Sequence, residues 1–252
     1  MIPIRTEWHA TTDVGAVRSV NEDRYFASAD LGVWAVADGM GGMSRGDWAS
    51  GQVVAALETL GRRASVDEML GDVASALARA NDLIFAEAEA QGNRMGTTAV
   101  VFVQRDLDFG LAWVGDSRAY LLRAGCLYRL SRDHSQVQEM VDAGLLEEAA
   151  AAKHPMRNVL TRAVGVVTPL AVDTVVNRLE PDDMVLLGSD GLYGVIGEGE
   201  MQDILTKLPI EAAAQAMLAR CHQLGAPDNI TFVAVSTFEV TLVQFGALEA
   251  ED

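Results

Sequence analysis

The sequence predicts an α+β fold, with sheets packed on helices, in one domain covering residues 1–240. The elements expected from hydrophobic periodicity come in the order strands, helices, strands, helices, strand, which does not match βαβ repeats. Short β-rich runs also follow one another through tight turns, as antiparallel neighbours do. The 252 residues are 50% hydrophobic and 22% charged, which is typical of a globular chain with one sizeable core.

The first third of the chain contains two strands followed by two helices. Asp30-Leu31-Gly32 has the composition of a turn and separates two apolar runs. Apolar residues then recur at helical spacing, and Gly92-Asn93 ends the second helical stretch. The expected elements are strands at 25–29 and 33–37, a helix at 47–63 capped by Asp47, and a helix at 66–91.

The middle of the chain changes to short β-rich runs. They predict one meander of sequential antiparallel strands at 98–104, 108–114, 119–123 and 126–130. Residues 136–165 follow, with a short helix at 137–143 and little apolar periodicity. A segment of this length and pattern is typical of a surface flap.

The last third contains strands and helices again. The expected elements are strands at 171–179 and 184–187, helices at 199–208 and 210–224, and a last strand at 230–238. Residues 241–252 are a C-terminal tail without an assigned element, although Thr241-Leu242-Val243 could extend the last strand.

Composition excludes some classes of function. A net charge of -17 and a pI near 4.5 argue against a nucleic-acid partner, which needs clustered Lys and Arg. The first residues lack the apolar core of a signal peptide, and no apolar run approaches the roughly 20 residues that span a bilayer. The expectation is therefore a cytoplasmic protein without a membrane partner, and a monomer is the default.

Aspartates stand at the ends of apolar runs, beside glycine, serine or asparagine: Asp38, Asp116, Asp190 and Asp228. Each dipeptide alone is usually a turn. Four carboxylates brought to strand ends can converge on one pocket, and converging carboxylates repel one another unless cations lie between them.

Two further features suggest phosphate chemistry at this pocket. Glu22 is a fifth acidic group and lies near Arg18 in the sequence. Gly39 lets the backbone approach a ligand closely, so its carbonyl could bind one metal while Asp38 bridges two. Magnesium and manganese prefer such oxygen ligands, and two of these ions can activate water and hold a phosphoryl group for in-line attack.

Eight motifs in order resemble the metal-dependent protein phosphatases of type 2C in their compact bacterial form, over about residues 5–238. They are Arg18-Ser19-Val20-Asn21-Glu22-Asp23, Asp38-Gly39-Met40-Gly41-Gly42, Gly96-Thr97-Thr98, Gly115-Asp116-Ser117-Arg118, Asp133-His134-Ser135, His154-Pro155-Met156-Arg157-Asn158 continuing to Gly165, Ser189-Asp190-Gly191-Leu192 and Asp228-Asn229-Ile230-Thr231. The resemblance implies an α-β-β-α sandwich, in which two antiparallel sheets lie between helical layers and a flap lies near the active site.

The resemblance also implies a role for each site residue. Asp38 would bridge two central Mn²⁺ or Mg²⁺ ions. Asp190 and Asp228 would complete the ligands of one ion, and Glu22 with the Gly39 carbonyl those of the other. Asp116 would bind a third, weaker ion together with Asp190. Arg18 would hold the substrate phosphate, and Asp23 would lie behind the metal ligands and orient Arg18 or metal-bound water.

Met40 departs from the pattern of many eukaryotic relatives. These have a histidine after Asp-Gly, which has been proposed as the general acid for the leaving alkoxide. A thioether cannot donate a proton. A metal-bound water or another residue must then take that role, and bacterial relatives commonly share the methionine.

The predicted function is hydrolysis of phosphoserine and phosphothreonine in proteins by metal-activated water, opposite a bacterial serine/threonine kinase. Three alternatives stay open. A pseudophosphatase would recognise phosphoproteins without hydrolysing them. A nonspecific acidic calcium-binding protein would prefer calcium, but the sequence has no EF-hand loop. A phosphatase of an anti-sigma switch usually has an added sensor domain, and none is visible.

Overall fold

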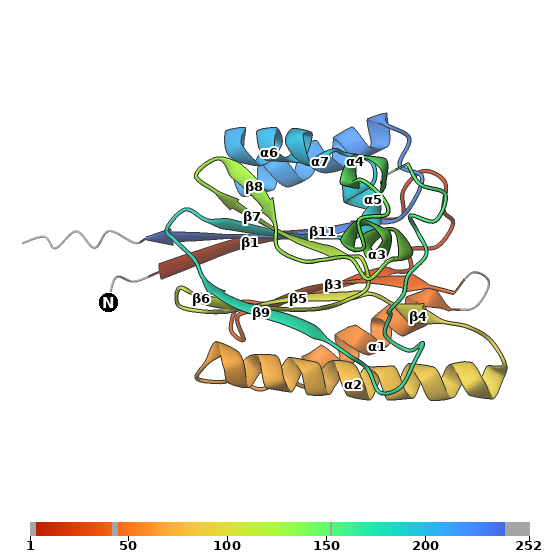
Figure 1. The fold of residues 1–252 in the computed structure, drawn as a ribbon. Coiled ribbons are helices and arrows are strands. Elements are labelled where there is room, and N and C mark those ends of the chain that lie inside the picture. Colours follow the sequence, from red (N-terminus) through yellow and green to blue (C-terminus); the bar gives the residue numbers. More distant parts are fainter. Residues whose placement is uncertain (1–3, 42–44, 152, 240–252) are drawn as a thin grey trace, which may run out of the picture.

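The computed structural model describes residues 4–41, 45–151 and 153–239, so the predicted tail at 241–252 lies outside the described residues (Figure 1). The first sheet has the strand order β1 (Ile4–Asp13), β11 (Ile230–Glu239), β10 (Met184–Gly188), β7 (Arg118–Arg123), β8 (Cys126–Arg129). The second has the order β2 (Asp23–Ser28), β3 (Val33–Met40), β5 (Ala99–Arg105), β6 (Asp108–Val114), β9 (Asp173–Arg178), and β4 (Gly96–Thr97) also pairs with β3. All pairings are antiparallel.

Helices cover the outer face of each sheet (Figure 1). The second sheet is covered by α1 (Gly46–Glu58) and α2 (Val66–Gln91), and the first by α6 (Glu198–Lys207) and α7 (Ile210–Gln223). Three shorter helices are α3 (Gln136–Asp142), α4 (Glu148–Ala151) and α5 (Asp190–Tyr193). The predicted α-β-β-α sandwich is therefore confirmed.

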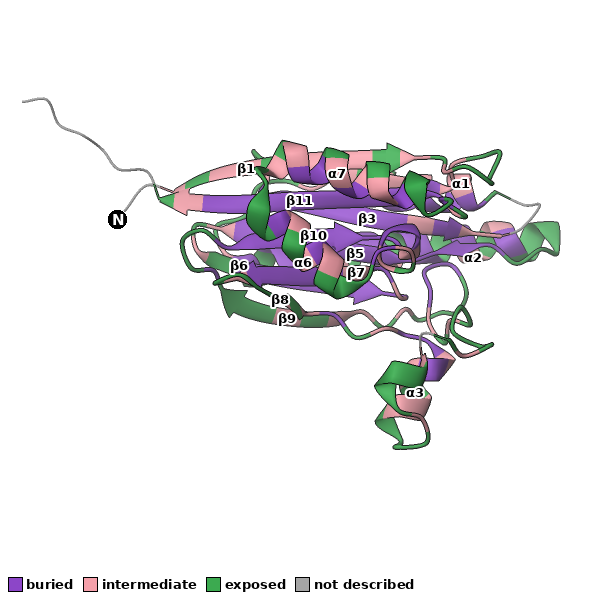
Figure 2. Cartoon of the chain, turned by 90° about the horizontal axis from the view of Figure 1, so that it is seen from above, coloured by how far each residue is buried: buried purple, intermediate pink, exposed green. Residues whose placement is uncertain are grey.

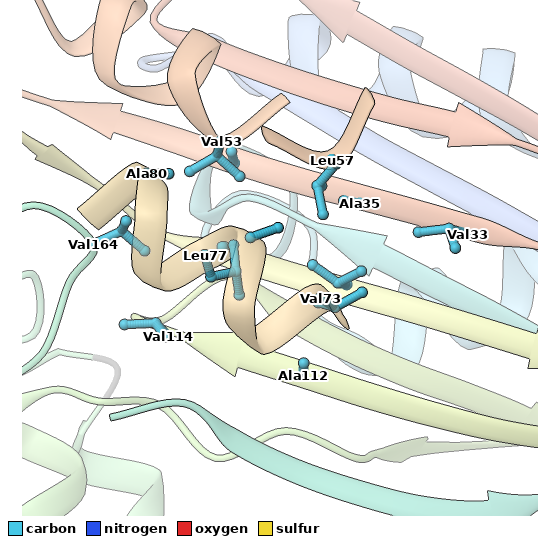
Figure 3. Close-up of a cluster of buried hydrophobic side chains, with 14 of the residues drawn as sticks. Val33, Ala35, Val53, Leu57, Val73, Leu77, Ala80, Ala112, Val114 and Val164 are labelled. Carbon is cyan, nitrogen blue, oxygen red and sulfur yellow. The ribbon is translucent and has the colours of Figure 1, made fainter. Parts of the chain in front are cut away.

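Three buried clusters hold the layers together. Val53 and Leu57 of α1 meet Val73 and Leu77 of α2 on the outer face of the second sheet (Figure 3). A cluster between the sheets includes Trp34, Phe102 and Val233, and a third lies between the first sheet and α6 and α7. The central strands are buried on both faces (Figure 2). Their sequences are continuously apolar for this reason, which is why a terminal aspartate stands out.

The long helix α2 has the predicted bounds because both of its ends carry local signals. The Ser65 side chain accepts a hydrogen bond from Glu68 N, and the Glu68 carboxylate accepts one from Ala64 N. At the other end, Gly92 adopts a left-handed conformation with φ 63°.

The helices within residues 4–41, 45–151 and 153–239 include none with the length and hydrophobicity of a membrane span.

The predicted cap of α1 is wrong. The helix begins at Gly46, which places Asp47 in its first turn, and the residue at the cap, Arg45, makes no side-chain capping bond. The carboxylate of Glu22 accepts a hydrogen bond from Gly46 N at 3.0 Å instead. A residue distant in sequence thus satisfies one of the free N–H groups at this helix end.

The predicted meander over 97–130 is also wrong. Strands β5 and β6 pair with each other, as do β7 and β8, but β7 pairs with β10 in the other sheet. The chain crosses between the sheets at Gly115, whose φ of 102° suits glycine. Strand β1 and helix α5 were not expected, and β3 continues beyond Ala37 through Asp38 to Met40.

The segment 136–165 lies at one end of the sandwich, where α3 projects away from the sheets (Figure 2). Its helix at Gln136–Asp142 agrees with the prediction to within one residue. His134 anchors its start, because His134 N donates to Gly115 O at 2.9 Å and Gly115 N donates to His134 Nδ1 at 3.0 Å. We refer to residues 136–165 as the flap, with residue 152 outside the described residues.

Candidate functional site

Carboxylates from both sheets meet at the flap end of the sandwich. Asp38 lies near the end of β3, Asp116 follows β6, Asp190 begins α5 after β10, and Asp228 precedes β11. Asp23 is the register partner of Asp38 across β2 and β3. The charges of Asp23, Asp190, Asp116 and Asp228 all act on the Asp38 carboxyl. The structure thus brings together the four aspartates that the sequence singled out.

Burial and mutual repulsion raise the pKa values of this group. Burial, then the charge of Asp23 and the other aspartates, raises the pKa of Asp38 well above its ordinary value. Burial is also the first cause for Asp23 and Asp190, whose pKa values rise to about 6, and for Asp116, whose pKa rises to about 7. Without added positive charge, these carboxyls hold protons that isolated aspartates would release.

The metal-free protein is therefore expected to lose thermal stability as the pH rises from about 4 to about 7. The folded-state pKa values of Asp23, Asp190 and Asp116 lie above the ordinary value, so the folded state binds more protons than the unfolded state in this window, and the free energy of unfolding falls with pH. Asp142 and Asp173 have lowered pKa values and titrate below this window. Burial lowers the pKa of His134, which acts in the opposite direction, but it is one group against four raised carboxyls.

The measurement is the melting temperature in EDTA across this pH window. Asp116→Asn should show a smaller decrease, because it removes one of the raised pKa values. Added Mn²⁺ should restore stability at neutral pH, since a cation replaces the protons. A melting temperature that rises steadily across the window in EDTA would contradict the prediction.

Two threonines hold the backbone of Asp38. Asp38 N donates to Thr98 Oγ1 at 2.9 Å, and Thr97 Oγ1 donates to Asp38 O at 2.9 Å. Thr98 Oγ1 also lies 2.6 Å from Ser117 Oγ, which follows Asp116. Gly96-Thr97-Thr98 was part of the motif set, but its role in positioning Asp38 was not predicted.

Glu22 and Gly39 lie side by side at the start of α1. The Glu22 carboxylate bonds Gly46 N, and Glu22 O accepts from Gly39 N at 3.2 Å and from Ser50 Oγ at 2.5 Å. A side chain at Gly39 would overlap Gly46 O. Glycine is required here because the backbone of β3 and the first turn of α1 are in close contact.

Asn229 is a positioning residue whose role was not predicted, although it belongs to the motif Asp228-Asn229-Ile230-Thr231. Its Oδ1 accepts from Glu22 N at 2.9 Å, and its Nδ2 donates to Val14 O and Val20 O at 2.9 and 3.0 Å. Asn229 therefore joins the loop that carries Arg18 and Glu22 to the start of β11. Its place directly after Asp228 was the only signal in the sequence.

Arg18 and Asp23 each have a protein partner that was not predicted. Arg18 Nη2 lies 2.7 Å from Asp228 Oδ2, and the arginine side chain is 53% exposed. Asp23 is buried, and its Oδ2 accepts a hydrogen bond from Ser189 Oγ at 2.8 Å. Arg18 is thus oriented by Asp228, whereas Asp23 connects β2 to the residue before Asp190.

A cleft of about 670 Å³ extends from these residues to the flap. Its lining includes four site residues, Arg18, Asp116, Asp190 and Asp228. The flap side contributes apolar, charged and neutral polar groups, among them Val137, Val141, Arg157 and Asn158. The cleft can therefore admit a polar group to the carboxylates and a chain segment beside the flap.

The donor set suits a hard divalent cation. Its oxygens come from carboxylates, as Mg²⁺ and Mn²⁺ prefer, and the raised pKa values mean that a cation would favour the ionised carboxylates. Asp38, Asp116, Asp190 and Asp228 all retain some exposure, so an ion can reach them. Among the described residues, however, no three His, Cys, Asp or Glu side chains are already arranged to hold a metal ion.

Comparison with known proteins gives consistent results. Residues 10–140 match the family model described as Protein phosphatase 2C. The serine/threonine phosphatase stp of Listeria welshimeri is 36% identical over 245 residues, covering 93% of this chain and 96% of its own.

Two solved structures share the fold. The Mycobacterium tuberculosis serine/threonine phosphatase PstP/Ppp has a TM-score of 0.86 at 32% identity, covering 93% of this chain and 99% of its own. A catalytic domain of PstP in complex with two manganese ions has a TM-score of 0.84 at 29% identity, covering 94% of this chain and all of its own.

Proposed function

This chain belongs to the protein phosphatase 2C family, and from this premise we propose that its carboxylate cluster hydrolyses phosphoserine and phosphothreonine in proteins. The enzyme is a metal-dependent serine/threonine phosphatase. The observation that carries the site assignment is the convergence of Asp23, Asp38, Asp116, Asp190 and Asp228 from both sheets, next to an exposed arginine.

In this proposal the carboxylates hold two central ions, and a third ion binds more weakly. Asp38 would bridge the central pair, Asp190 and Asp228 would hold one, and Glu22 with the Gly39 carbonyl the other. Asp116 would hold the third with Asp190. When bound, Mn²⁺ or Mg²⁺ acidifies water and neutralises phosphoryl oxygens. The manganese complex of the related catalytic domain supports two ions.

Arg18 would bind the phosphate of the substrate. Its partner in the structure is Asp228, at 2.7 Å. A cation held by Asp228 would weaken that pair and leave the guanidinium available for bidentate contact with phosphate. Asp228 therefore positions Arg18 in the lining of the cleft.

Arg18→Ala is expected to raise KM for a phosphopeptide by about tenfold or more, with a smaller loss in kcat, because it removes a charged contact to phosphate and leaves the metal ligands in place. Arg18→Lys should recover part of the loss, since it keeps the charge without the bidentate geometry. The measurement is the KM and kcat of each variant from steady-state kinetics in Mn²⁺. An unchanged KM in Arg18→Ala would remove Arg18 from the phosphate site.

The activity is tested by phosphate release from a phosphothreonine peptide with Mn²⁺, and EDTA is the control. Binding without release would favour a pseudophosphatase. We also propose that the enzyme works in the cytoplasm as a monomer opposite a serine/threonine kinase. Light scattering after size-exclusion chromatography tests the monomer.

A further inference from the structure

Asp116 and Asp190 lie at the same end of a strand pair in the first sheet. Strands β7 and β10 are antiparallel, and their pairing ends with Arg118 opposite Gly188. Asp116 precedes this pair in the chain by two residues, and Asp190 follows it by two. The sheet therefore brings the two carboxylates to one edge but does not pair the residues that carry them.

The side chain of Tyr193 connects the two segments beyond the end of the sheet. Tyr193 is the last residue of α5, which begins at Asp190. Its hydroxyl donates a hydrogen bond to the backbone carbonyl of Asp116 at 2.9 Å. All three residues line the cleft. One hydrogen bond thus joins the loop that carries Asp116 to the helix that carries Asp190.

The surroundings of Tyr193 keep its hydroxyl a donor in a fixed position. Burial, and then the charge of Asp116, raise the pKa of Tyr193, so the phenol keeps its proton. The ring packs against the buried cluster between the first sheet and α6 and α7. Tyr193 therefore has an apolar body held by the fold and a polar tip bonded to the Asp116 carbonyl.

Arg118 holds the Tyr193 ring from the side of the cleft loop. Its guanidinium carbon lies 3.9 Å from the centroid of the ring. Asp133 holds the guanidinium in turn, with Nε of Arg118 at 3.0 Å and Nη2 at 2.7 Å from its two carboxylate oxygens. Because Arg118 follows Asp116 by two residues, one chain segment contacts Tyr193 through both its backbone and a side chain.

The two carboxylates repel each other, so their spacing needs a support of this kind. Burial, and then the charge of Asp190, raise the pKa of Asp116. The charge of Arg118 acts to lower the pKa values of both carboxyl groups, but burial outweighs it. Without a link between the two segments, repulsion would favour a wider separation.

Other contacts hold the Asp116 loop to different parts of the fold. Gly115 N donates to His134 Nδ1 at 3.0 Å, and Ser117 Oγ lies 2.6 Å from Thr98 Oγ1. Neither His134 nor Thr98 belongs to α5. These contacts keep the loop in place if the Tyr193 hydroxyl is removed, so that change should alter the spacing of the carboxylates without unfolding the loop.

We infer that Tyr193 is a positioning residue that fixes the spacing of Asp116 and Asp190 and thereby sets the affinity for the third ion. The inference rests on the proposed function, in which these two carboxylates hold that ion. Groups that orient metal ligands from behind typically change metal affinity by about 10-fold to 100-fold when they are removed.

The test is a calorimetric titration of the full chain with Mn²⁺, after metal has been removed with EDTA and the EDTA by dialysis. In the wild-type protein a weaker class of ion should be resolved from the two tighter ions, and Asp116→Asn should weaken that class alone. Tyr193→Phe keeps the ring and its packing. Its weaker dissociation constant should rise by about tenfold, while the tighter constants stay within about twofold.

Two further variants separate position from charge and from the loss of any hydroxyl. Arg118→Lys keeps the positive charge but cannot form the bidentate pair with Asp133, so it should also raise the weaker dissociation constant. Tyr128→Phe removes a hydroxyl from an exposed tyrosine on β8, which is not in the cleft lining, and should match the wild-type protein.

A Tyr193→Phe protein with the wild-type weaker constant, or with all constants raised equally, would overturn the role of Tyr193. The first result would mean that the hydrogen bond does not set the spacing, and the second that Tyr193 supports the fold as a whole. A weaker class that is missing from the wild-type protein, or unchanged in Asp116→Asn, would refute the third ion and this inference with it. Release of phosphate from a phosphothreonine peptide would still support the proposed activity in that case.

Discussion

Asp38→Asn is expected to reduce hydrolysis of p-nitrophenyl phosphate in Mn²⁺ by roughly a thousandfold or more. Besides burial, four acidic neighbours raise the pKa of Asp38. No other carboxyl group among the described residues has a pKa that is raised by as many acidic neighbours. Its loss removes the group proposed to bridge both central ions, while the amide keeps the size of the side chain. Turnover near the wild-type rate would remove Asp38 from the mechanism.

The same substitution should stabilise the protein in EDTA. Ionisation of the Asp38 carboxyl is unfavourable in the metal-free state, because it is buried among other carboxylates. Asparagine removes this cost, so the melting temperature without metal should rise. The increase that Mn²⁺ produces in the wild-type protein should shrink, since fewer ligands remain. Opposite effects on activity and metal-free stability distinguish a ligand from a residue that supports the fold.

Asp203→Asn is a matched control for both measurements. Asp203 is on α6, and its exposed side chain pairs with Lys207 at the surface. Like Asp38→Asn, this substitution removes one negative charge, but it leaves the carboxylate cluster unchanged. Activity and the Mn²⁺-dependent increase in melting temperature should both match the wild-type protein, because exposed ion pairs contribute little.

Gly191→Ala is expected to destabilise the fold by roughly 2–4 kcal/mol and to abolish most activity. A side chain at Gly191 would overlap the carbonyl oxygen of Asn229. The backbone fixes the positions of both the added Cβ and the Asn229 carbonyl oxygen, so rotation of a side chain cannot relieve the clash. Relief requires α5, which begins at Asp190, to move away from the strand that follows Asp228. The two carboxylates proposed to share an ion would then separate.

Gly51→Ala provides the comparison for this prediction. Gly51 lies inside α1, and a side chain there would meet nothing within 4 Å. Alanine in a helix interior is favoured over glycine by roughly 0.5–1 kcal/mol, so this variant should be as stable as the wild type or more so. Thermal unfolding and steady-state turnover measure both variants. A Gly191→Ala protein with wild-type stability and turnover would show that this contact does not set the site geometry.

Local sequence signals were sufficient for elements whose ends are defined by neighbouring residues. The helix at 66–91 is an example, because Ser65 and Glu68 begin it and Gly92 ends it. The strand 108–114 was also predicted with its observed bounds. Where an end depends on a distant group the prediction failed, as at α1, where Glu22 and not Asp47 accepts the hydrogen bond from the first helical N–H group, that of Gly46.

Strand pairing could not be predicted from local pattern. The runs at 108–114 and 119–123 are near in sequence, yet they belong to different sheets, because each is paired by a strand from elsewhere in the chain. Strand β1 was missed because its residues are only partly buried and alternate weakly. The periodicity of apolar side chains shows whether a segment is a strand, but not which other strand it pairs with.

The long helices, most of the strands and the identity of the acidic residues could be predicted from the sequence, because periodicity and apolar runs that end in aspartate are properties of short segments. The pairing of Arg18 with Asp228 and the hydrogen bond between Asn229 and Glu22 are visible only in the folded protein. These contacts join residues up to about two hundred positions apart, and they form only when both sheets pack.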